Sequence, residues 1–386
     1  MKTSTLKKKA QKRLTASYQS SLNLLAYGSD NLYPQTADLI VSASPTGAVC
    51  LDRYAKFIKG NGFLDVPFSE YVVNRSGETA DELHSLICDD LARYGGFALH
   101  VNYNIFGEIV EVQHFPFQNV RLAECDDDGF ISELVTHPDF TGESTRNKKR
   151  LSVTAANCER FPIFNPDRNV VRAQIIKAGG IEFYKGQILY ISRAGRMKYP
   201  TTIYDSVLTD MSTDEGISNI KYRDVRHGFV AAGIVVTEKG SPVDGMDLSD
   251  DELQEELDEL QTQLEKLQGD EAVGKLLAVS VGQNEKAPEV KPLQKANHDK
   301  LFEVTEKSTT ERIYAAFNQE AFYRIRTGSV GFSSEMMEDA YSLYAAMVTP
   351  EQRMIERAFT RIFKHWHEAC NPSNDFSTQP LKYMKL

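Results

Sequence analysis

The chain has 386 residues, of which 41% are hydrophobic and 25% charged, a balance typical of a globular protein and not of a disordered one. No apolar run approaches the roughly 18 to 20 residues that cross a bilayer, so we expect no membrane partner. The formal net charge of −10 argues against a protein that wraps nucleic acid by neutralising its phosphates.

The N-terminus is basic. Residues 1–15 hold six lysine and arginine residues and no apolar stretch behind them, so they do not form a secretory signal. We therefore predict a basic N-terminal arm over residues 1–30. It is either solvated or docked on an acidic neighbour.

Helix and strand signals fill residues 31–202. Ser44 and Pro45 predict the N-cap and first position of a helix that ends at Gly60. Residues 79–82 form a capping box that opens a second helix. Alternating apolar residues over 97–112, with a turn at 104–107, predict a β-hairpin. Further strands are predicted at 120–123, 170–176 and 187–191. The fold class is therefore α+β.

After residue 202 the composition changes. Two long helices are predicted, over 203–228 and 296–318, with a compact insertion over 229–295 between them. In the insertion, strands at 229–236 and 275–281 flank a helix at 249–268 that opens on a capping box. Its leucines repeat at steps of four and three and must pack on something else: Leu253, Leu257, Leu260, Leu264 and Leu267. Ten acidic residues against one lysine over 249–271 predict a solvated face or a docking face.

The C-terminal part begins with a loop over 319–333. Arg324 and Arg326 alternate there with aromatic and aliphatic residues and precede Thr327 and Gly328. Forked guanidinium donors suit phosphate contacts, and salt bridges between subunits are an equally good interpretation. A helix is predicted over 334–348. A further helix starts at Thr349, as N-cap, with Gln352 completing a capping box.

Known catalytic motifs are missing. The sequence has no P-loop, dinucleotide fingerprint, zinc-protease motif or nucleophile elbow, so no enzyme activity and no cofactor is predicted. The five cysteines are scattered and odd in number, which suits a reducing cytoplasm. Residues 126–128 offer three aspartates, which an acidic turn explains more simply than a cation site. His365, His367 and Cys370 are spaced wrongly for one metal on a helix, so no metal is predicted.

The order of these parts resembles the portal family of tailed bacteriophages. The first long helix opens with the run from Tyr204 to Leu208 and closes at residues 228–229, like the first stem helix of a portal. The insertion over 230–293 lies where portals carry the clip. The helix over 298–317 resembles the returning stem helix. Residues 328–348 resemble the loop and helix that face the central tunnel.

The resemblance implies a portal-like α+β fold. It has a wing over 31–202, stem helices at 203–228 and 296–318, a clip at 229–295 and a tunnel loop at 319–333. Tunnel and crown helices follow at 334–386. It also implies a non-enzymatic ring of twelve subunits in the virion, at one capsid vertex, assembled in the bacterial host cytoplasm.

The resemblance further implies partners. Double-stranded DNA would pass through the ring without sequence-specific binding, guided by Arg324, Arg326 and Thr327. The terminase large subunit and then head–tail connector proteins would dock on the clip, where Leu253, Leu257, Leu260 and Leu264 are the candidate contacts. The major capsid protein or a scaffold protein would hold the ring at the vertex. The alternatives are another head-completion or scaffold-linked phage protein, or a metal-dependent nucleic-acid enzyme.

Overall fold

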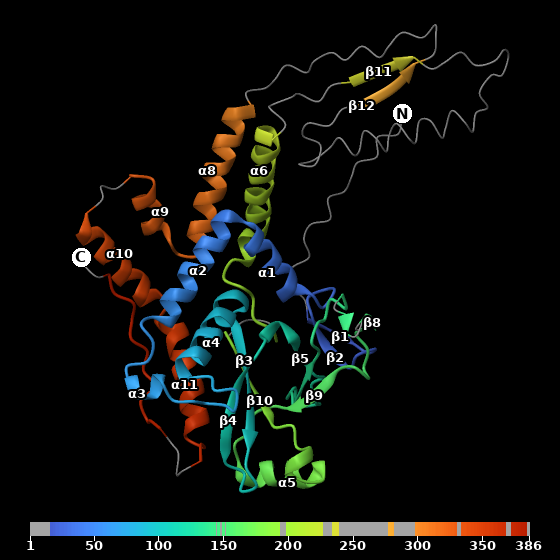
Figure 1. Cartoon of the computed structure of the whole chain (residues 1–386), viewed down its shortest axis with the longest axis vertical. Coiled ribbons are helices and arrows are strands. Elements are labelled where there is room, and N and C mark those ends of the chain that lie inside the picture. Colours follow the sequence, from blue (N-terminus) through green and yellow to red (C-terminus); the bar gives the residue numbers. More distant parts are fainter. Residues whose placement is uncertain are drawn as a thin grey trace, which may run out of the picture. The chain divides into compact units, whose positions relative to one another are not determined.

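The computed structural model describes residues 16–143, 145–146, 149–150, 152–193, 198–226, 234–238, 277–281, 298–329, 333–367 and 372–383. The chain divides into two compact units. The first contains Met1–Ser42, Gly47–Leu208 and Ile313–Leu386, and the second contains Ala43–Thr46 and Thr209–Arg312. Each mixes helices with small sheets, so the α+β class is confirmed (Figure 1).

The first unit begins with a β-hairpin. Strands β1 (Ala16–Gln19) and β2 (Leu24–Tyr27) pair antiparallel, and the side chains of Leu24 and Tyr27 are buried. This hairpin corrects the prediction of an arm for the part of residues 1–30 that the structure describes. Four buried side chains tie it to the core: Leu22, Leu24, Ala26 and Tyr27.

Helices α1 (Tyr33–Ala43), α2 (Pro45–Lys59), α3 (Val66–Ser69) and α4 (Ala80–Tyr94) follow. The capping box predicted for α4 is confirmed, because Glu82 N donates to Thr79 Oγ1 and Thr79 N donates to the Glu82 carboxylate. Gly95 ends the helix at φ +76°, a left-handed conformation that glycine adopts without strain.

Helix α4 packs on an antiparallel sheet of order β10-β3-β4, built from β3 (Gly96–Tyr103), β4 (Ile109–Phe115) and β10 (Gln187–Ser192). The hairpin predicted over 97–112 and the strand predicted at 187–191 are both confirmed. The β4 edge is bridged to Trp366 and the β10 edge to Ile163, so other parts of the unit lie at both edges.

A second sheet has the order β5-β6-β9, with β5 (Val120–Leu122), β6 (Glu133–Thr136) and β9 (Glu159–Pro162). Strands β7 (Thr145–Arg146) and β8 (Lys149–Arg150) form a short ribbon. Side chains from both larger sheets share a core with the first hairpin: Tyr27, Tyr94, Ala98, Phe117, Val120, Leu122, Leu134, Phe161, Ile188 and Tyr199.

The strand predicted at 170–176 is wrong. These residues lie in helix α5 (Arg168–Ala178), which begins after the Asp167 N-cap and ends at Gly179 with φ +91°. Four β-branched residues in this segment favour a strand locally. The Asp167 carboxylate, which accepts from Asn169 N at 2.8 Å, and the glycine stop favour the helix.

The C-terminal helices of the first unit are α9 (Glu320–Arg326), α10 (Ser334–Met347) and α11 (Thr349–Phe363). The predicted capping box at Thr349 is wrong, since Gln352 is buried and donates instead to the Phe57 and Ile58 carbonyls at 3.1 and 3.3 Å. Phe376 from the segment after α11 packs on an aromatic cluster with Phe68, Phe359 and Phe363.

The second unit is built on helix α6 (Leu208–Arg226) and helix α8 (His298–Ala316), the two long helices predicted from the sequence. Strands β11 (Ile234–Glu238) and β12 (Leu277–Val281) lie between them in sequence and pair in parallel. Parallel neighbours need a crossover connection, which agrees with the strand–helix–strand order predicted for the insertion. The helix predicted at 249–268 lies outside the described residues.

Candidate channel and assembly surfaces

The three residues predicted to face DNA lie together at the end of α9, a helix that replaces the first part of the predicted loop. Arg324 is exposed, and its guanidinium has no partner among the described residues. Arg326 is also exposed and donates to Tyr314 OH at 3.1 Å. Thr327 Oγ1 donates to Arg324 O at 3.2 Å. This surface therefore carries the Arg324 guanidinium, which has no partner among the described residues, and the Arg326 guanidinium, which is held by a hydrogen bond.

A buried amide fixes the turn that leads into α9. Gln319 is fully buried, and its Nε2 donates to Cys50 O at 2.8 Å and to Tyr344 OH at 2.9 Å. Its Oε1 accepts from Arg53 Nη1 at 2.8 Å. Gln319 therefore joins α2 and α10 at the start of α9.

Aromatic packing then holds α9 against the unit. The Phe322 ring lies 5.9 Å from Phe57 and 5.6 Å from Tyr344, centroid to centroid. The Arg53 guanidinium lies 4.7 Å from the Phe322 centroid, within range of a cation–π contact. Because its inner face is anchored in this way, α9 presents Arg324 and Arg326 on a supported surface.

In the second unit, two ion pairs show the relative direction of helices α6 and α8. Asp210, near the start of α6, pairs with Arg312, near the end of α8, at 3.4 Å. Lys221, near the end of α6, pairs with Glu306, nearer the start of α8. The helices are therefore antiparallel and lie side by side (Figure 1).

The same pair leaves large apolar side chains uncovered. Met211 and Ile217 on α6 and Thr309 on α8 are buried. Tyr222 and Val304 instead expose 61% and 68% of their surface.

Asp214 on α6 caps the start of α2 from within the second unit. Its Oδ2 accepts from Ser44 Oγ at 2.6 Å and from Thr46 N at 2.9 Å. Asp214 is only 6% exposed. The predicted start of α2 is confirmed, but the anion at its N-terminus is Asp214, 168 residues away from Thr46 in sequence.

The predicted clip contacts cannot be placed. Leu253, Leu257, Leu260 and Leu264 lie outside the described residues, and only β11 and β12 of that segment are described. Their role remains a proposal.

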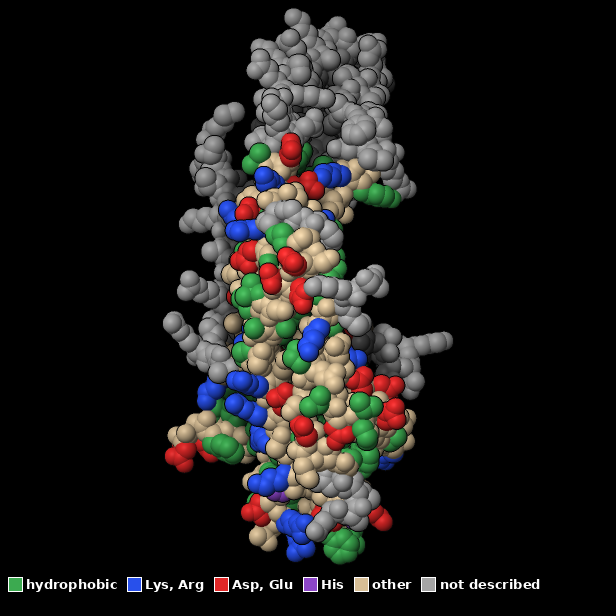
Figure 2. Space-filling view, turned by 90° about the vertical axis from the view of Figure 1, so that its left-hand side faces the viewer, with side chains coloured by type: hydrophobic (Ala, Val, Ile, Leu, Met, Phe, Trp, Pro, Cys, Tyr) green, Lys and Arg blue, Asp and Glu red, His purple; other side chains and the backbone are tan. Residues whose placement is uncertain are grey.

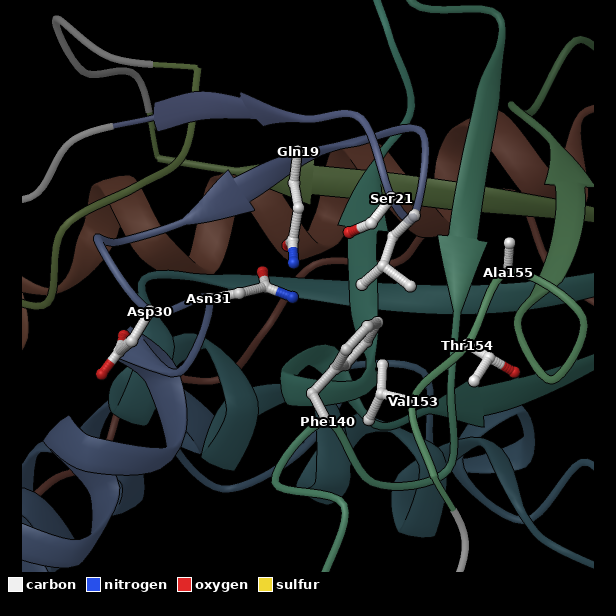
Figure 3. A pocket seen from close by; sticks show the side chains of 9 residues that line it. Gln19, Ser21, Asp30, Asn31, Phe140, Val153, Thr154 and Ala155 are labelled. Carbon is white, nitrogen blue, oxygen red and sulfur yellow. The ribbon is translucent and has the colours of Figure 1, made fainter.

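The first unit has a cavity of about 300 Å³ beside the N-terminal hairpin (Figure 3). Its lining combines the hairpin with three loops: Gln19, Ser21, Leu22, Asp30, Asn31, Phe140, Val153, Thr154 and Ala155. Gln19 and Asn31 point their amides towards one another. Asn31 Oδ1 accepts from Arg121 Nε at 2.7 Å, and Arg121 is fully buried. This arrangement supports the loop structure around the cavity.

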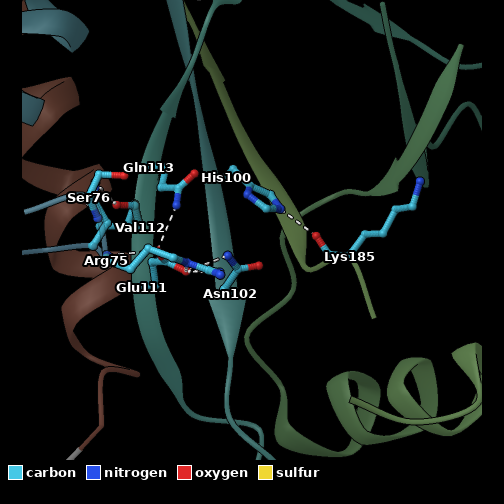
Figure 4. Close-up of polar contacts among 9 residues, drawn as sticks. Arg75, Ser76, His100, Asn102, Glu111, Val112, Gln113 and Lys185 are labelled. Carbon is cyan, nitrogen blue, oxygen red and sulfur yellow. Dashed lines mark hydrogen bonds and ion pairs between the residues drawn. The ribbon is translucent and has the colours of Figure 1, made fainter. Parts of the chain in front are cut away.

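A polar cluster converges on Glu111 of β4 (Figure 4). Arg75 Nε and Nη2 donate to its two oxygens at 2.9 and 2.8 Å, and Asn102 and Gln113 donate as well. The hydrogen bonds from Arg75 are the main reason that the pKa of Glu111 is lowered to about 2. A carboxylate held ionised and fully engaged suits a structural role better than proton transfer.

The metal candidates find no support in the part of the chain that is described. Asp126 Oδ1 accepts from Phe130 N at 2.7 Å, so the aspartates form an acidic turn between β5 and β6. His365 and His367 flank a bridge to Ile109, and Cys370 lies outside the described residues. Among the described residues, no three histidine, cysteine or acidic side chains gather as a metal site would require, and none of the helices is long and apolar enough to span a bilayer.

No protein-family model matches the chain, and no curated protein matches it. Solved structures are similar to it. A chain from the neck of a native GTA particle computed with C12 symmetry is 14% identical over 86% of this chain and 79% of that chain, with a TM-score of 0.47. An HK97 family phage portal protein from Corynebacterium diphtheriae is 12% identical over 78% of this chain and 85% of that chain, with a TM-score of 0.31. Both TM-scores are below 0.5.

Proposed function

We propose that this chain is the portal subunit of a tailed phage or prophage. It assembles as a ring at one capsid vertex, and double-stranded DNA is packaged and ejected through that ring. The observation that carries the proposal is the antiparallel pair α6 and α8, which flanks an inserted segment with two parallel strands. The sequence resemblance to portals assigns this pair to the stem and the inserted segment to the clip.

The partners follow from that assignment. The terminase large subunit, and later head–tail connector proteins, dock on the clip, where the leucines at 253, 257, 260 and 264 are the candidate contacts. The ring has twelve copies, is held by the major capsid or scaffold protein, and belongs to the virion. It needs no catalysis of its own, since terminase moves the DNA.

The charge of the chain fits a conduit. A surface with a formal net charge of −10 repels phosphates, so a duplex can pass without being held. Exposed charges act over only about 8 Å at physiological ionic strength, so only groups near the channel wall affect the DNA. Arg324 and Arg326 are the candidate guides at the wall.

The proposal is tested by the mass and shape of the purified full-length chain. We expect a closed ring with a central hole in negative-stain images, and a native mass close to twelve times 43.4 kDa. A chain that stays monomeric at micromolar concentration, with and without a scaffold or capsid protein, would contradict it. A discrete assembly without a hole would favour a head-completion or scaffold-linked protein. Divalent-dependent nuclease activity lost on changing Asp127 and Asp128 would favour an enzyme.

The guiding role of the α9 arginines gives a separate prediction. Replacing Arg324 and Arg326 by alanine removes two cations from an exposed surface without touching the Gln319 contacts. We expect rings to form normally and DNA retention in packaged particles to fall severalfold, as judged by nuclease-protected DNA per particle. The matched control is Arg172→Ala with Lys177→Ala on α5, two exposed cations away from α9. Equal retention in both double variants would refute the role.

A further inference from the structure

The outer face of α11 and the residue after it carry a row of cations. Arg353, Arg357, Arg361 and Lys364 follow one another at steps of four, four and three, and all four are exposed. Residues at these steps are neighbours on one side of a helix, where like charges destabilise it by a few tenths of a kcal/mol per pair. Figure 2 shows Lys and Arg side chains following one another down the lower part of the face on the left of Figure 1, where α11 lies.

The acids of α11 do not neutralise this row, because both are engaged elsewhere. Glu351 accepts from Tyr54 OH at 3.0 Å, and Glu356 accepts from Thr378 N at 2.9 Å. The side chains of Arg353, Arg357 and Lys364 have no polar partner among the described residues. The Arg361 guanidinium lies 5.5 Å from the centroid of the Phe164 ring, within range of a cation–π contact. The other three cations of the row are free to meet an anionic surface from outside the unit.

An acidic surface of similar size lies on the connection between β5 and β6. Glu124, Asp126, Asp127 and Asp128 are exposed there, next to Phe130, which is 59% exposed. The turn is fixed by Asp126 Oδ1, which accepts from Asp128 N at 3.1 Å and from Phe130 N at 2.7 Å. Lys198 Nζ donates to the carbonyl oxygen of Gly129 within this turn at 3.2 Å, and not to a carboxylate of the described residues.

The two surfaces belong to opposite edges of the central sheet. Trp366, three residues after α11, is bridged to the β4 edge, and Ile163, directly after β9, is bridged to the β10 edge. Figure 1 shows the sheet β5-β6-β9, which carries the acidic turn, beyond β10-β3-β4 from α11. The long Arg361 side chain of α11 reaches Phe164, next to Ile163. A ring of identical subunits needs such an arrangement, because each copy joins its neighbours through two different surfaces.

We propose that the cationic row at 353–364 of one copy contacts the acidic turn at 124–128 of the next copy in the ring. This inference rests on the proposed ring and names its subunit contact. Four cations facing four carboxylates offset the net repulsion between copies that each carry −10. A second copy is favoured over nucleic acid as the occupant because that charge also opposes phosphate binding, while the matching carboxylates lie on the same chain.

The experiment is a charge exchange in the full-length chain. Arg353→Glu with Arg357→Glu reverses the row, and Asp127→Lys with Asp128→Lys reverses the turn without removing the Asp126 hydrogen bonds. We expect each pair alone to raise the concentration at which half the chain is assembled by about tenfold or more at physiological salt. The four changes together should restore it to within a few fold. Arg172→Glu with Lys177→Glu is the matched control and should leave assembly unchanged.

The outcomes separate this contact from the ring itself. Native mass measures assembly, and circular dichroism checks that each variant is folded. A wild-type ring with unchanged assembly in the Arg353/Arg357 variant would overturn this contact and leave the proposed function standing. A fourfold variant no better assembled than its parents would also overturn the contact. Normal rings that lose bound duplex DNA would assign the row to nucleic acid, against the proposal. A monomeric wild type would overturn both.

Discussion

Replacing Asp214 by alanine is expected to free the start of α2 and to lower the free energy of unfolding by about 2 to 4 kcal/mol. The carboxylate accepts from Ser44 Oγ and Thr46 N in a setting where Asp214 is 6% and Ser44 0% exposed. An N-cap is worth about 1 kcal/mol, and hydrogen bonds to a charged group are worth about 1.5 to 3 kcal/mol. Alanine removes the acceptor and leaves these donors buried.

Amide hydrogen exchange gives the direct readout. The Thr46 amide should lose most of its protection in Asp214→Ala, and urea unfolding followed by far-UV circular dichroism should report the lower stability. Asp214→Asn keeps an acceptor oxygen without the charge and should recover about half of the loss. The matched control is Asp52→Ala, an exposed acid on α2 paired with Lys56, which should cost only a few tenths of a kcal/mol. Unchanged exchange at Thr46 would show that another group caps α2.

The Asp214 contact shows where inference from the sequence stops. The start of α2 is predictable, because Ser44 and Pro45 are local signals. The anion that binds this terminus is 168 residues away from Thr46, and no spacing rule connects the two. Local signals succeed where the partners lie within one turn, as in the Thr79–Glu82 capping box of α4.

The errors have the same physical origin. Residues 170–176 have the composition of a strand. They form a helix because Asp167 caps its N-terminus and Gly179 ends it. Gln352 fits a capping box by spacing, but the carbonyls at the end of α2 compete for its amide and bind it. In both cases a propensity of a few tenths of a kcal/mol yields to caps or tertiary contacts.

For the candidate surfaces, the sequence indicates residue types better than their arrangement. It singles out Arg324 and Arg326 by their alternation with aromatic residues, but not Gln319, which positions α9. The spacing of the arginines on α11 is sufficient to predict the cationic row. The sequence predicts the acidic turn, while the position of the turn relative to α11 depends on topology.

The second large effect is expected in acid and comes from His84 on α4. Its side chain is fully buried, and its ring centroid lies 4.6 Å from that of Phe63 and 6.4 Å from that of Phe359. Neither ring nitrogen has a hydrogen-bond partner within the described residues. Burial lowers the pKa of His84 from 6.5 to about 4. The nearby Asp81 carboxylate raises the pKa and the Lys59 ammonium lowers it, each by less than burial does.

The sign of the effect follows from which state binds the proton. Between pH 6.5 and about pH 4 the unfolded chain protonates this histidine and the folded chain does not. Above pH 6.5 this histidine should therefore not reduce the free energy of unfolding. Below pH 6.5 that free energy should fall by up to about 1.4 kcal/mol per pH unit, to a total loss of about 3 kcal/mol near pH 4.

The measurement is urea unfolding at several pH values, followed by the fluorescence of Trp366, the one tryptophan of the sequence. Trp366 is 5% exposed and stacks on Phe363, whose ring belongs to the same aromatic cluster as Phe359. In His84→Leu this part of the pH dependence should vanish, while the part that comes from Glu111 should stay in both proteins. At pH 7.5 the variant should be at least as stable as the wild type, because leucine carries no unpaired polar atoms into the cluster. Equal slopes in both proteins between pH 6.5 and pH 4 would show that His84 takes up its proton without unfolding its surroundings.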